Sequence, residues 1–198
     1  MRAVLFDMDG VLVFSEDVWF DVYNRTLALF GHAAISRPEF DAIYGNGTGA
    51  DRAAYMPERT VPEIDAAYGR FFAERIGAIR VNPEAPGVLR ALRAAGVRTA
   101  LATNTNRPLA DRILESAGLA PLLDAVACAS EAGAGKPDPA VVRLAAERAG
   151  APLATCLFVG DSKYDQEAAR RAPVAFRGYR TGAPRIESLE EILSIRID

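Results

Sequence analysis

The sequence predicts an α/β protein with a three-layer α/β/α core around a parallel sheet and a small all-α cap inserted after the first strand. Short apolar runs typical of buried strands alternate with amphipathic segments that end at glycine, and this order indicates a parallel sheet covered by helices on both faces. The cap is indicated by residues 15 to about 80, where apolar residues recur at helical spacing and no comparable strand run occurs.

The first expected strand covers residues 2–6 and ends in Asp-Met-Asp-Gly, a sequence that stops a buried strand at a turn. Four further apolar runs are expected to be strands, at residues 97–103, 125–128, 156–159 and 174–177. Helices are expected at residues 88–95, 108–117, 139–149 and 165–172, with a closing helix at residues 186–193. Glycine directly follows three of these helices, as is typical of helix C-termini.

The inserted segment divides the chain into a core of residues 1–14 and 83–198 and a cap of residues 15–82. Ser15, followed by two acidic residues, indicates the start of the first cap helix, because acidic side chains stabilise an N-terminal turn. The two junctions between core and cap would form a hinge pair. The alternative is one larger α/β domain that carries the extra helices on one face.

Composition limits the chemistry that the chain can perform. It has one histidine, His32, and two cysteines, Cys128 and Cys156, so it cannot build a multi-histidine metal site or a Cys-x-x-Cys motif. Both cysteines are expected in the core. Only two of the 23 basic residues are lysines. Catalysis is therefore expected to rest on carboxylates, hydroxyls, backbone amides and a lysine.

Charge and hydropathy exclude several classes of partner. The net charge is −3 and the arginines form no cationic run, so no nucleic-acid partner is expected. The N-terminal apolar run is too short for a signal peptide, and the longest uncharged apolar stretch is too short for a membrane span. We expect a soluble, cytoplasmic protein without a membrane partner.

Two carboxylates follow the first expected strand, at the edge where ligands bind to open parallel sheets. Asp7 and Asp9 face the same side, because residues two apart on a strand share a face. The two charges would repel each other unless a cation lies between them, so the pair favours a hard metal ion. Gly10 allows the chain to turn close to that ion. An Asp-x-Asp-Gly turn is also common without a metal ion.

Two further sets of residues, at positions 103–104 and 136, carry groups that suit an anion. Thr103 and Asn104 end one strand and offer a hydroxyl and a backbone N–H, although such a pair is also an ordinary helix cap. Lys136 lies between glycine and proline in a chain that otherwise prefers arginine. Its compact ammonium can approach a phosphoryl oxygen where a guanidinium group would not fit.

A second acidic pair follows the strand expected at residues 156–159. Asp161 lies at the strand end and Asp165 on the first turn of the next helix. Four residues apart, the two carboxylates can face one point, which suits a metal ion with oxygen ligands. Two acids at a helix N-terminus are also favoured by the helix dipole alone.

In this order the motifs resemble those of the haloacid dehalogenase-like hydrolase superfamily, subfamily I, and most closely its phosphoglycolate phosphatase-like branch. The matching segments are Asp7-Met8-Asp9-Gly10-Val11-Leu12, Thr103-Asn104, Lys136-Pro137 and Gly160-Asp161-Ser162 with Asp165. The resemblance covers the whole core, and it implies a Rossmann-like core with the helical insert as its cap.

The resemblance implies a Mg²⁺-dependent phosphatase that hydrolyses a small phosphorylated metabolite through an aspartyl-phosphate intermediate. Asp7 would be the nucleophile, and Asp9 would act as general acid and then as general base. The residues implied for the phosphate are Thr103, Lys136, Met8 and Asn104, and those implied for Mg²⁺ are Asp7, Asp9, Asp161 and Asp165.

Substrate choice is expected to depend on the cap. Residues 45–52 resemble the flexible cap loop that reaches the site in this superfamily, with Thr48, Asp51 and Arg52 as candidate substrate contacts. A plain connection between two helices is the alternative. Phe14 stands at the first hinge where relatives commonly carry aspartate, so expectations about cap closure do not carry over.

Two other functions are compatible with these motifs. A phosphosugar mutase of the β-phosphoglucomutase type is the enzymatic alternative, although the cap loop lacks the Gly-x-Ser-Arg sequence of such relatives. A phosphoaspartate signalling module is the alternative from another class, and the motif order and the inserted cap weigh against it. The expected partner is a small phosphorylated metabolite, and the chain is expected to be a monomer or a homodimer.

Overall fold

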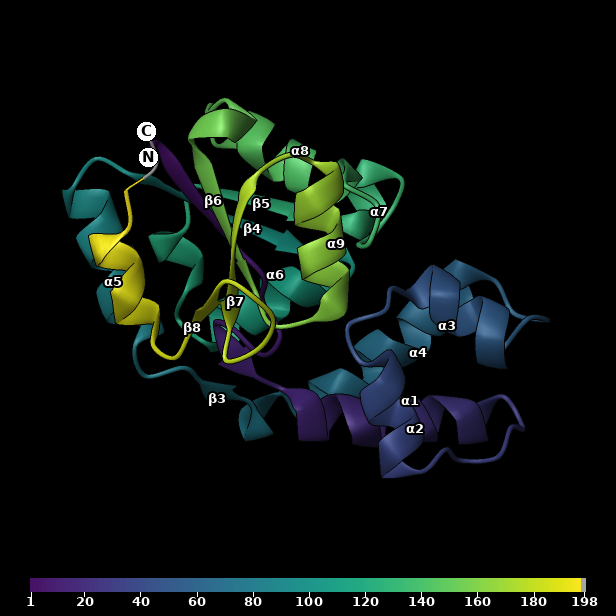
Figure 1. Cartoon of the computed structure of the whole chain (residues 1–198). Coiled ribbons are helices and arrows are strands. Elements are labelled where there is room, and N and C mark those ends of the chain that lie inside the picture. The colour runs from purple at the N-terminus through teal and green to yellow at the C-terminus, as the bar shows by residue number, and fades with distance from the viewer. Residues whose placement is uncertain (197–198) are drawn as a thin grey trace.

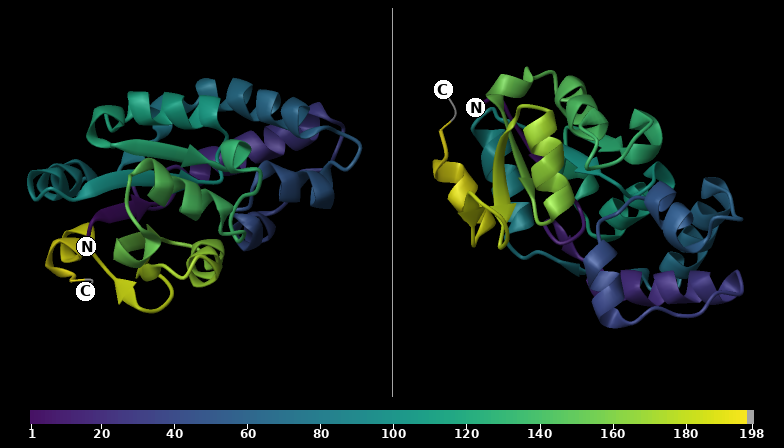
Figure 2. Two further views of the ribbon diagram at one scale, coloured as in Figure 1. Left: turned by 90° about the horizontal axis from the view of Figure 1, so that it is seen from above. Right: turned by 45° about the vertical axis from the view of Figure 1, so that its right-hand side comes forward.

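The computed structural model describes residues 1–196 and has two parts (Figure 1). The larger part is a parallel sheet with helices on both faces. The smaller part consists of helices α1–α4, which are inserted after the first strand and lie beyond one edge of the sheet. Two further views show the same separation (Figure 2). The predicted α/β core with a helical cap is confirmed.

Six parallel strands form the core sheet, in the order β5-β4-β1-β6-β7-β8. Their bounds are β1 (Ala3–Phe6), β4 (Arg98–Thr103), β5 (Ala125–Cys128), β6 (Cys156–Gly160), β7 (Ala175–Tyr179) and β8 (Arg185–Ile186). In the centre, Phe6 of β1 lies beside Leu101 of β4 and Val159 of β6. Because the strands are parallel, the residues that follow β1, β4 and β6 meet at one edge of the sheet.

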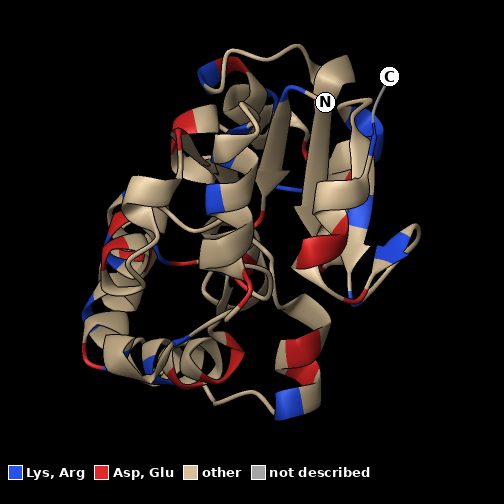
Figure 3. Ribbon diagram, turned by 90° about the vertical axis from the view of Figure 1, so that its left-hand side faces the viewer, with Lys and Arg blue, Asp and Glu red and all other residues tan. Residues whose placement is uncertain are grey.

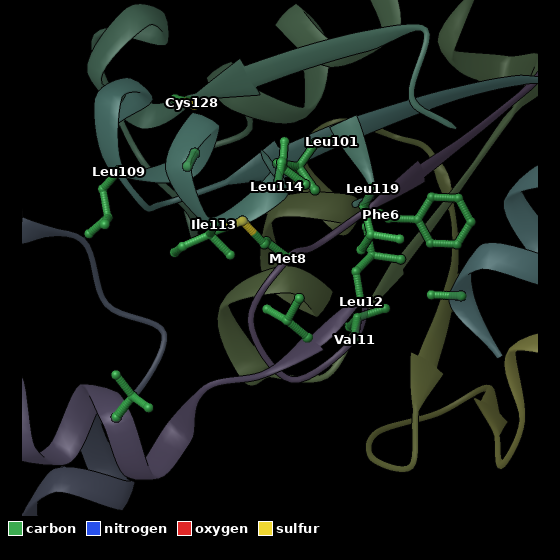
Figure 4. Close-up of a cluster of buried hydrophobic side chains, with 14 of the residues drawn as sticks. Phe6, Met8, Val11, Leu12, Leu101, Leu109, Ile113, Leu114, Leu119 and Cys128 are labelled. Atoms are coloured by element: carbon green, nitrogen blue, oxygen red, sulfur yellow. The ribbon is translucent and has the colours of Figure 1, made fainter. Parts of the chain in front are cut away.

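Alternate residues of each strand face opposite layers of helices. The helices are α5 (Ala85–Ala94), α6 (Arg107–Ser116), α8 (Ala140–Arg148) and α9 (Lys163–Arg171), with a short α7 (Ala129–Ala132). Val4 and Phe6 belong to the cluster that α5 and α6 cover, whereas Ala3 and Leu5 belong to the cluster that α8 and α9 cover. Figure 4 shows part of the first cluster, where side chains of β1, β4 and α6 pack together.

The C-terminal segment differs from the closing helix predicted at residues 186–193. Ile186 ends β8, which pairs with β7, and a 3₁₀ helix, η4 (Leu189–Ser194), follows it. Ser188 starts this helix, and its hydroxyl donates to Glu84 (2.9 Å) at the start of α5. The pairing of β8 with β7 and the helix cap at Ser188 outweigh the helical spacing of the apolar residues in this segment. The prediction of one continuous helix at residues 186–193 is therefore wrong.

Four helices form the cap, namely α1 (Glu16–Leu29), α2 (Arg37–Ile43), α3 (Thr48–Tyr55) and α4 (Val61–Ala73). Capping boxes at Ser36 and Thr60 start α2 and α4. Helix α1 starts after Ser15, as predicted, but the Ser15 hydroxyl caps no helical N–H. Aromatic rings join α1 to α4, and the centroids of Trp19 and Phe72 lie 4.9 Å apart.

Two short antiparallel strands join the cap to the core. β2 (Val13–Phe14) pairs with β3 (Arg80–Val81), so the two predicted junctions lie side by side. Asn82 is buried directly after β3, and its amide donates to the Val11 carbonyl (2.8 Å) and the Tyr179 hydroxyl (3.1 Å). This side chain therefore ties the end of the insertion to the loop after β1 and to β7.

Several predictions from composition can be compared with the structure. Both cysteines are free and buried, as expected of small core residues. Basic and acidic residues are interspersed along the helices of both parts (Figure 3). Among the described residues, no helix is both long enough and apolar enough to cross a membrane.

Candidate functional site

A cavity of about 70 Å³ lies between the strand ends of the core sheet and the cap. The core side is lined by six of the residues predicted from the sequence, namely Asp7, Asp9, Thr103, Asn104, Lys136 and Asp161. The cap side is lined by aromatic residues of α1, α2 and α4 and by polar residues of α3 and the loop before it. The fold thus brings all four motifs together at one edge of the sheet.

Lys136 lies between two carboxylates. Its Nζ is 2.7 Å from Asp7 Oδ1 and 2.7 Å from Asp165 Oδ1, and its side chain is 2% exposed. The other oxygen of Asp165 accepts the Ser162 N–H (3.0 Å) at the start of α9. Asp165 is therefore fully engaged, and it fixes the ammonium beside Asp7.

Three carboxylates form a compact cluster. Asp7, Asp161 and Asp165 each place an oxygen within 4.8 Å of the others. Gly10 leaves space for this cluster, because a Cβ at this position would lie 1.8 Å from Asp161 Oδ2, and its φ of +83° also favours glycine. One lysine compensates only part of the charge of three carboxylates, so this set of oxygens fits a hard divalent cation.

Burial is the largest influence on the pKa values of Asp7 and Asp161 in this cluster. It raises the pKa of Asp7 to about 7, against the opposing charge of Lys136. It also raises the pKa of Asp161 well above its ordinary value, and the charges of Asp165 and Asp7 act in the same direction. Burial alone would lower the pKa of Lys136, but the charges of Asp165 and Asp7 outweigh it and raise that pKa. The lysine thus stays charged, and the raised pKa values of Asp7 and Asp161 favour proton binding by these two carboxylates, which a divalent cation would oppose.

Asp9 accepts three hydrogen bonds from side chains that sequence analysis did not identify as part of the site. The Ser15 hydroxyl and the Trp19 indole N–H (2.9 Å) donate to Oδ1, and the Thr105 hydroxyl donates to Oδ2 (3.0 Å). Ser15 and Trp19 belong to the start of the cap, whereas Thr105 follows β4 of the core. Core and cap therefore position this carboxylate together. The only signal in the sequence is that the single tryptophan lies near the start of the first cap helix.

Asn104 connects three segments around the cavity. Its amide donates to the carbonyls of Gly45 (2.9 Å) and Lys136 (2.9 Å), and its Oδ1 accepts the Lys136 N–H (2.7 Å). Thr103 is buried beside it, and its hydroxyl oxygen accepts the Thr105 N–H (3.1 Å). The Asn104 side chain thus holds the loop that carries the lysine and contacts the cap in the same place.

Met8 and Thr48, both predicted to contact the substrate, form contacts that the sequence does not reveal. The Met8 side chain is buried in the core, and its N–H donates to Asp7 Oδ1 (2.7 Å). The prediction of a flexible loop over residues 45–52 is wrong beyond residue 47, because α3 starts at Thr48. Thr48 lines the cavity, and its hydroxyl donates to Asp65 (2.6 Å).

Arg52 and Asp51 lie on the same helix but in different places. The Arg52 guanidinium donates to the carbonyls of Arg59 (2.5 Å) and Pro57 (3.1 Å), and it is not part of the described cavity lining. Asp51 lines the cavity and is buried. The carboxylate, and not the guanidinium, is therefore the charged group that α3 presents to the cavity.

Known proteins resemble this chain both in sequence and in fold. A model of haloacid dehalogenase-like hydrolases matches residues 1–173. A phosphoglycolate phosphatase of Agrobacterium fabrum is 32% identical over 98% of this chain and 87% of its own, and one of Rhodospirillum rubrum is 34% identical over 95% and 84%. The crystal structure of CbbY from Rhodobacter sphaeroides in complex with phosphate has the same fold, with a TM-score of 0.83 and 24% identity over 97% of this chain and 96% of that one.

Proposed function

The chain belongs to the haloacid dehalogenase-like hydrolases, and we propose that it is a Mg²⁺-dependent phosphatase that hydrolyses a small phosphate monoester through a phosphoaspartate at Asp7. The observation that carries this proposal is the meeting of Asp7, Asp9, Lys136 and Asp161 in one cavity. A carboxylate nucleophile needs no histidine base, which suits a chain whose single histidine lies outside the described lining of that cavity.

In the first step, a carboxylate oxygen of Asp7 attacks phosphorus, and the bond between phosphorus and the ester oxygen breaks. Asp9 gives its proton to the departing ester oxygen, so the alcohol leaves as a neutral hydroxyl compound. The hydrogen bonds from Trp19 and Thr105 restrain the orientation of the Asp9 side chain.

In the second step, water attacks phosphorus, and the bond between phosphorus and the Asp7 oxygen breaks. Asp9, now a carboxylate, takes one proton from the water, which restores its acid form. The products are inorganic phosphate and the alcohol, and both side chains return to their starting states.

Lys136, Thr103 and the Asn104 N–H are placed to stabilise the phosphoryl oxygens. We assign the Mg²⁺ site to Asp7 and Asp161 together with the Asp9 backbone carbonyl, with Asp165 in a supporting position. When bound, the cation supplies positive charge to the phosphoryl oxygens. The lysine, fixed by Asp165, supplies the same type of stabilisation from the protein itself.

We assign residues 1–14 and 83–198 to a core domain and residues 15–82 to a cap domain; of these, 197–198 lie outside the described residues. The pairing of β2 with β3 supports this boundary, because both chain crossings occur there. Phe14 lies at the first crossing, with the Arg80 guanidinium 5.8 Å from its ring centroid.

A panel of phosphate monoesters with Mg²⁺ tests the proposal. We expect the wild type to release inorganic phosphate over many turnovers from p-nitrophenyl phosphate and from at least one small metabolite. Asp7→Asn should abolish release, whereas the matched control Asp17→Asn, at a side chain that is 86% exposed on the cap, should not change it. Failure to hydrolyse any member of the panel would contradict the proposal.

The same panel separates the alternative functions. A phosphosugar mutase would convert a sugar phosphate into an isomer without releasing phosphate. A phosphoaspartate signalling module would keep the phosphoryl group after a single turnover. Sustained phosphate release, lost in Asp7→Asn, supports the phosphatase against both.

A further inference from the structure

The cap end of the cavity has a different chemistry from the core end. We call the part lined by Trp19, Tyr23, Phe40, Asp51 and Tyr68 the cap chamber. Its rings contact one another edge to face, with centroid distances of 5.4 Å between Trp19 and Tyr68 and 5.9 Å between Tyr23 and Phe40. Rings held in this way form a largely apolar wall with fixed faces.

One carboxylate interrupts this apolar wall. Asp51 is 7% exposed, and its Oδ2 accepts a hydrogen bond from the Tyr68 hydroxyl (3.1 Å). Among the described residues that line the cavity, Lys136 is the only basic one, and Asp7 and Asp165 already hold it. Burial raises the pKa of Asp51 to about 7, the charge of Asp65 acts in the same direction, and the hydrogen bond from Tyr68 opposes the rise.

A second polar group of the cap chamber has no partner. The Tyr23 side chain is 3% exposed, and its buried hydroxyl forms no hydrogen bond with any described residue. Burial raises the pKa of Tyr23, and the charge of Asp51 raises it further, so the hydroxyl lies within the electrostatic reach of that carboxylate. Buried hydroxyls are nearly always hydrogen-bonded, and each exception needs an explanation. A ligand that satisfies both Tyr23 and Asp51 provides one.

The cap chamber does not suit an anionic leaving group. A carboxylate bound there would face Asp51 in surroundings of low polarity, where like charges repel strongly. Lys136 cannot relieve this repulsion, because its ammonium is held between Asp7 and Asp165 at the core end. The groups of the cap chamber itself are one carboxylate and two phenol hydroxyls, and the further polar residues of the cap that line the cavity, Tyr44, Asn46 and Thr48, carry no charge that would balance Asp51.

We propose that the cap chamber binds a protonated amine on the leaving group, so that the substrates are phosphate monoesters of small amino alcohols. The proposal rests on the phosphatase activity, in which Asp7 receives the phosphoryl group at the other end of the same cavity. The ammonium would form an ion pair with Asp51 and donate to the Tyr23 oxygen. Aromatic faces of the chamber would add cation–π attraction.

Three two-carbon phosphate esters separate the possible chemistries. O-Phosphoethanolamine ends in an ammonium, 2-hydroxyethyl phosphate in a hydroxyl and 2-phosphoglycolate in a carboxylate. With Mg²⁺, we expect the wild type to show a kcat/KM for the ammonium ester at least about 100-fold above that for the carboxylate ester, with the hydroxyl ester between them. A wild-type preference for the carboxylate or the hydroxyl ester would overturn the amine assignment.

Variants of the cap chamber test the same inference from the protein side. Asp51→Asn removes the charge and keeps the shape, so it should reduce the ammonium-to-carboxylate ratio by about tenfold or more. Tyr23→Phe removes only the hydroxyl and provides a second test if Asp51→Asn does not fold; it should lower kcat/KM for the ammonium ester about threefold to tenfold. Asp17→Asn, on the exposed surface of the cap, should leave the ratio unchanged. A ratio that neither chamber variant changes would contradict the proposal.

Failure of this inference can be distinguished from failure of the proposed function. If p-nitrophenyl phosphate is turned over and none of the three two-carbon esters is, the amine assignment is overturned while the phosphatase stands. If no phosphate ester is hydrolysed at all, the proposed function fails and the amine assignment fails with it.

Discussion

The two ends of the cavity are built from different kinds of structural element. At the core end, charged and polar side chains follow the strands and engage one another, as when Lys136 bridges Asp7 and Asp165. At the cap end, helices supply aromatic rings around the Asp51 carboxylate and the Tyr23 hydroxyl. Within residues 1–196, Asp51 has no basic partner and the Tyr23 hydroxyl has no hydrogen-bond partner. In the function that we propose, the core end performs the reaction, and a ligand would satisfy the polar groups at the cap end.

This difference separates the chemistry from the choice of substrate. Strand ends of a parallel sheet hold their side chains in fixed positions, which suits groups that stabilise a transferring phosphoryl group. Helices of the cap can carry different side chains without disturbing the sheet. Asp9 is the point where the two ends meet, because it accepts hydrogen bonds from Trp19 of the cap and Thr105 of the core.

The largest effect is expected at the core end, from Asp9→Asn. Loss of the general acid and base should lower kcat about 100-fold to 10,000-fold for alkyl phosphates. With p-nitrophenyl phosphate, whose leaving group needs little protonation, the first step should persist and phosphoenzyme should accumulate. Rapid-quench kinetics would show a burst of p-nitrophenol followed by slow turnover. Equal loss of both steps for both kinds of ester would contradict the assigned role.

Metal binding should give the next largest effect. The folded-state pKa of Asp7 is raised to about 7, so without metal the stability that its proton supports is present below about pH 4 and is lost as pH rises through about 7. The pKa of Asp161 is raised as well, so its proton contributes in the same direction. Mg²⁺ replaces these protons, and at 100 times its Kd it should stabilise the fold by about 2.7 kcal/mol. Thermal unfolding should show a larger gain with Mg²⁺ at pH 8 than at pH 5.5.

Asp161→Asn provides the control for this prediction. It removes one carboxylate from the cluster and should lose most of the increase in Tm with Mg²⁺. Asp51→Asn lies at the cap end and should keep that increase. An increase that does not depend on pH, or that survives in Asp161→Asn, would contradict the assignment of the metal to the core end.

A smaller effect on stability is expected from Asp51→Asn at the cap end. Burial raises the pKa of Asp51 to about 7, so the wild type loses stability as pH rises towards and through that value, while the amide does not titrate. The variant should therefore gain roughly 1–3 kcal/mol in unfolding free energy relative to wild type between pH 5 and pH 8. Urea denaturation at the two pH values measures this change. A difference between variant and wild type that is constant with pH would argue against a charged, unpaired Asp51.

The smallest effect is expected at the contact between the two ends. Trp19→Phe removes the indole N–H that donates to Asp9 and keeps a ring against Phe72. We expect kcat to fall about threefold to tenfold for alkyl phosphates and less for p-nitrophenyl phosphate, with Tm close to that of the wild type. The same loss for every leaving group would show that Trp19 acts on binding or folding and not through Asp9.

The core end could be predicted from the sequence because its residues occur at fixed distances from strands. Asp7 and Asp161 each follow an apolar run that is readable as a strand, and Thr103 ends another such run. Lys136 is unusual in a chain rich in arginine. Parallel strands then bring these positions together wherever the intervening helices lie. The structure places all four at one cavity for this reason.

The cap end could not be predicted in the same way. Helical spacing shows that residues such as Tyr23 and Tyr68 are buried, but it does not show which rings line a cavity and which fill the core. On α3, Asp51 and Arg52 are adjacent in sequence, and only the packing of the helix determines that the carboxylate faces inward. The hydrogen bond from Trp19 to Asp9 likewise depends on how the cap packs on the core.

Trapping the phosphoryl group tests the central claim most directly. The Asp9→Asn variant, mixed with p-nitrophenyl phosphate and Mg²⁺ and quenched with borohydride, should be reduced at its acyl phosphate to homoserine. Peptide mass spectrometry is expected to find homoserine at position 7 in this sample and in no sample prepared without substrate. Aspartate unchanged at position 7, or reduction at position 161 or 165 instead, would contradict the account.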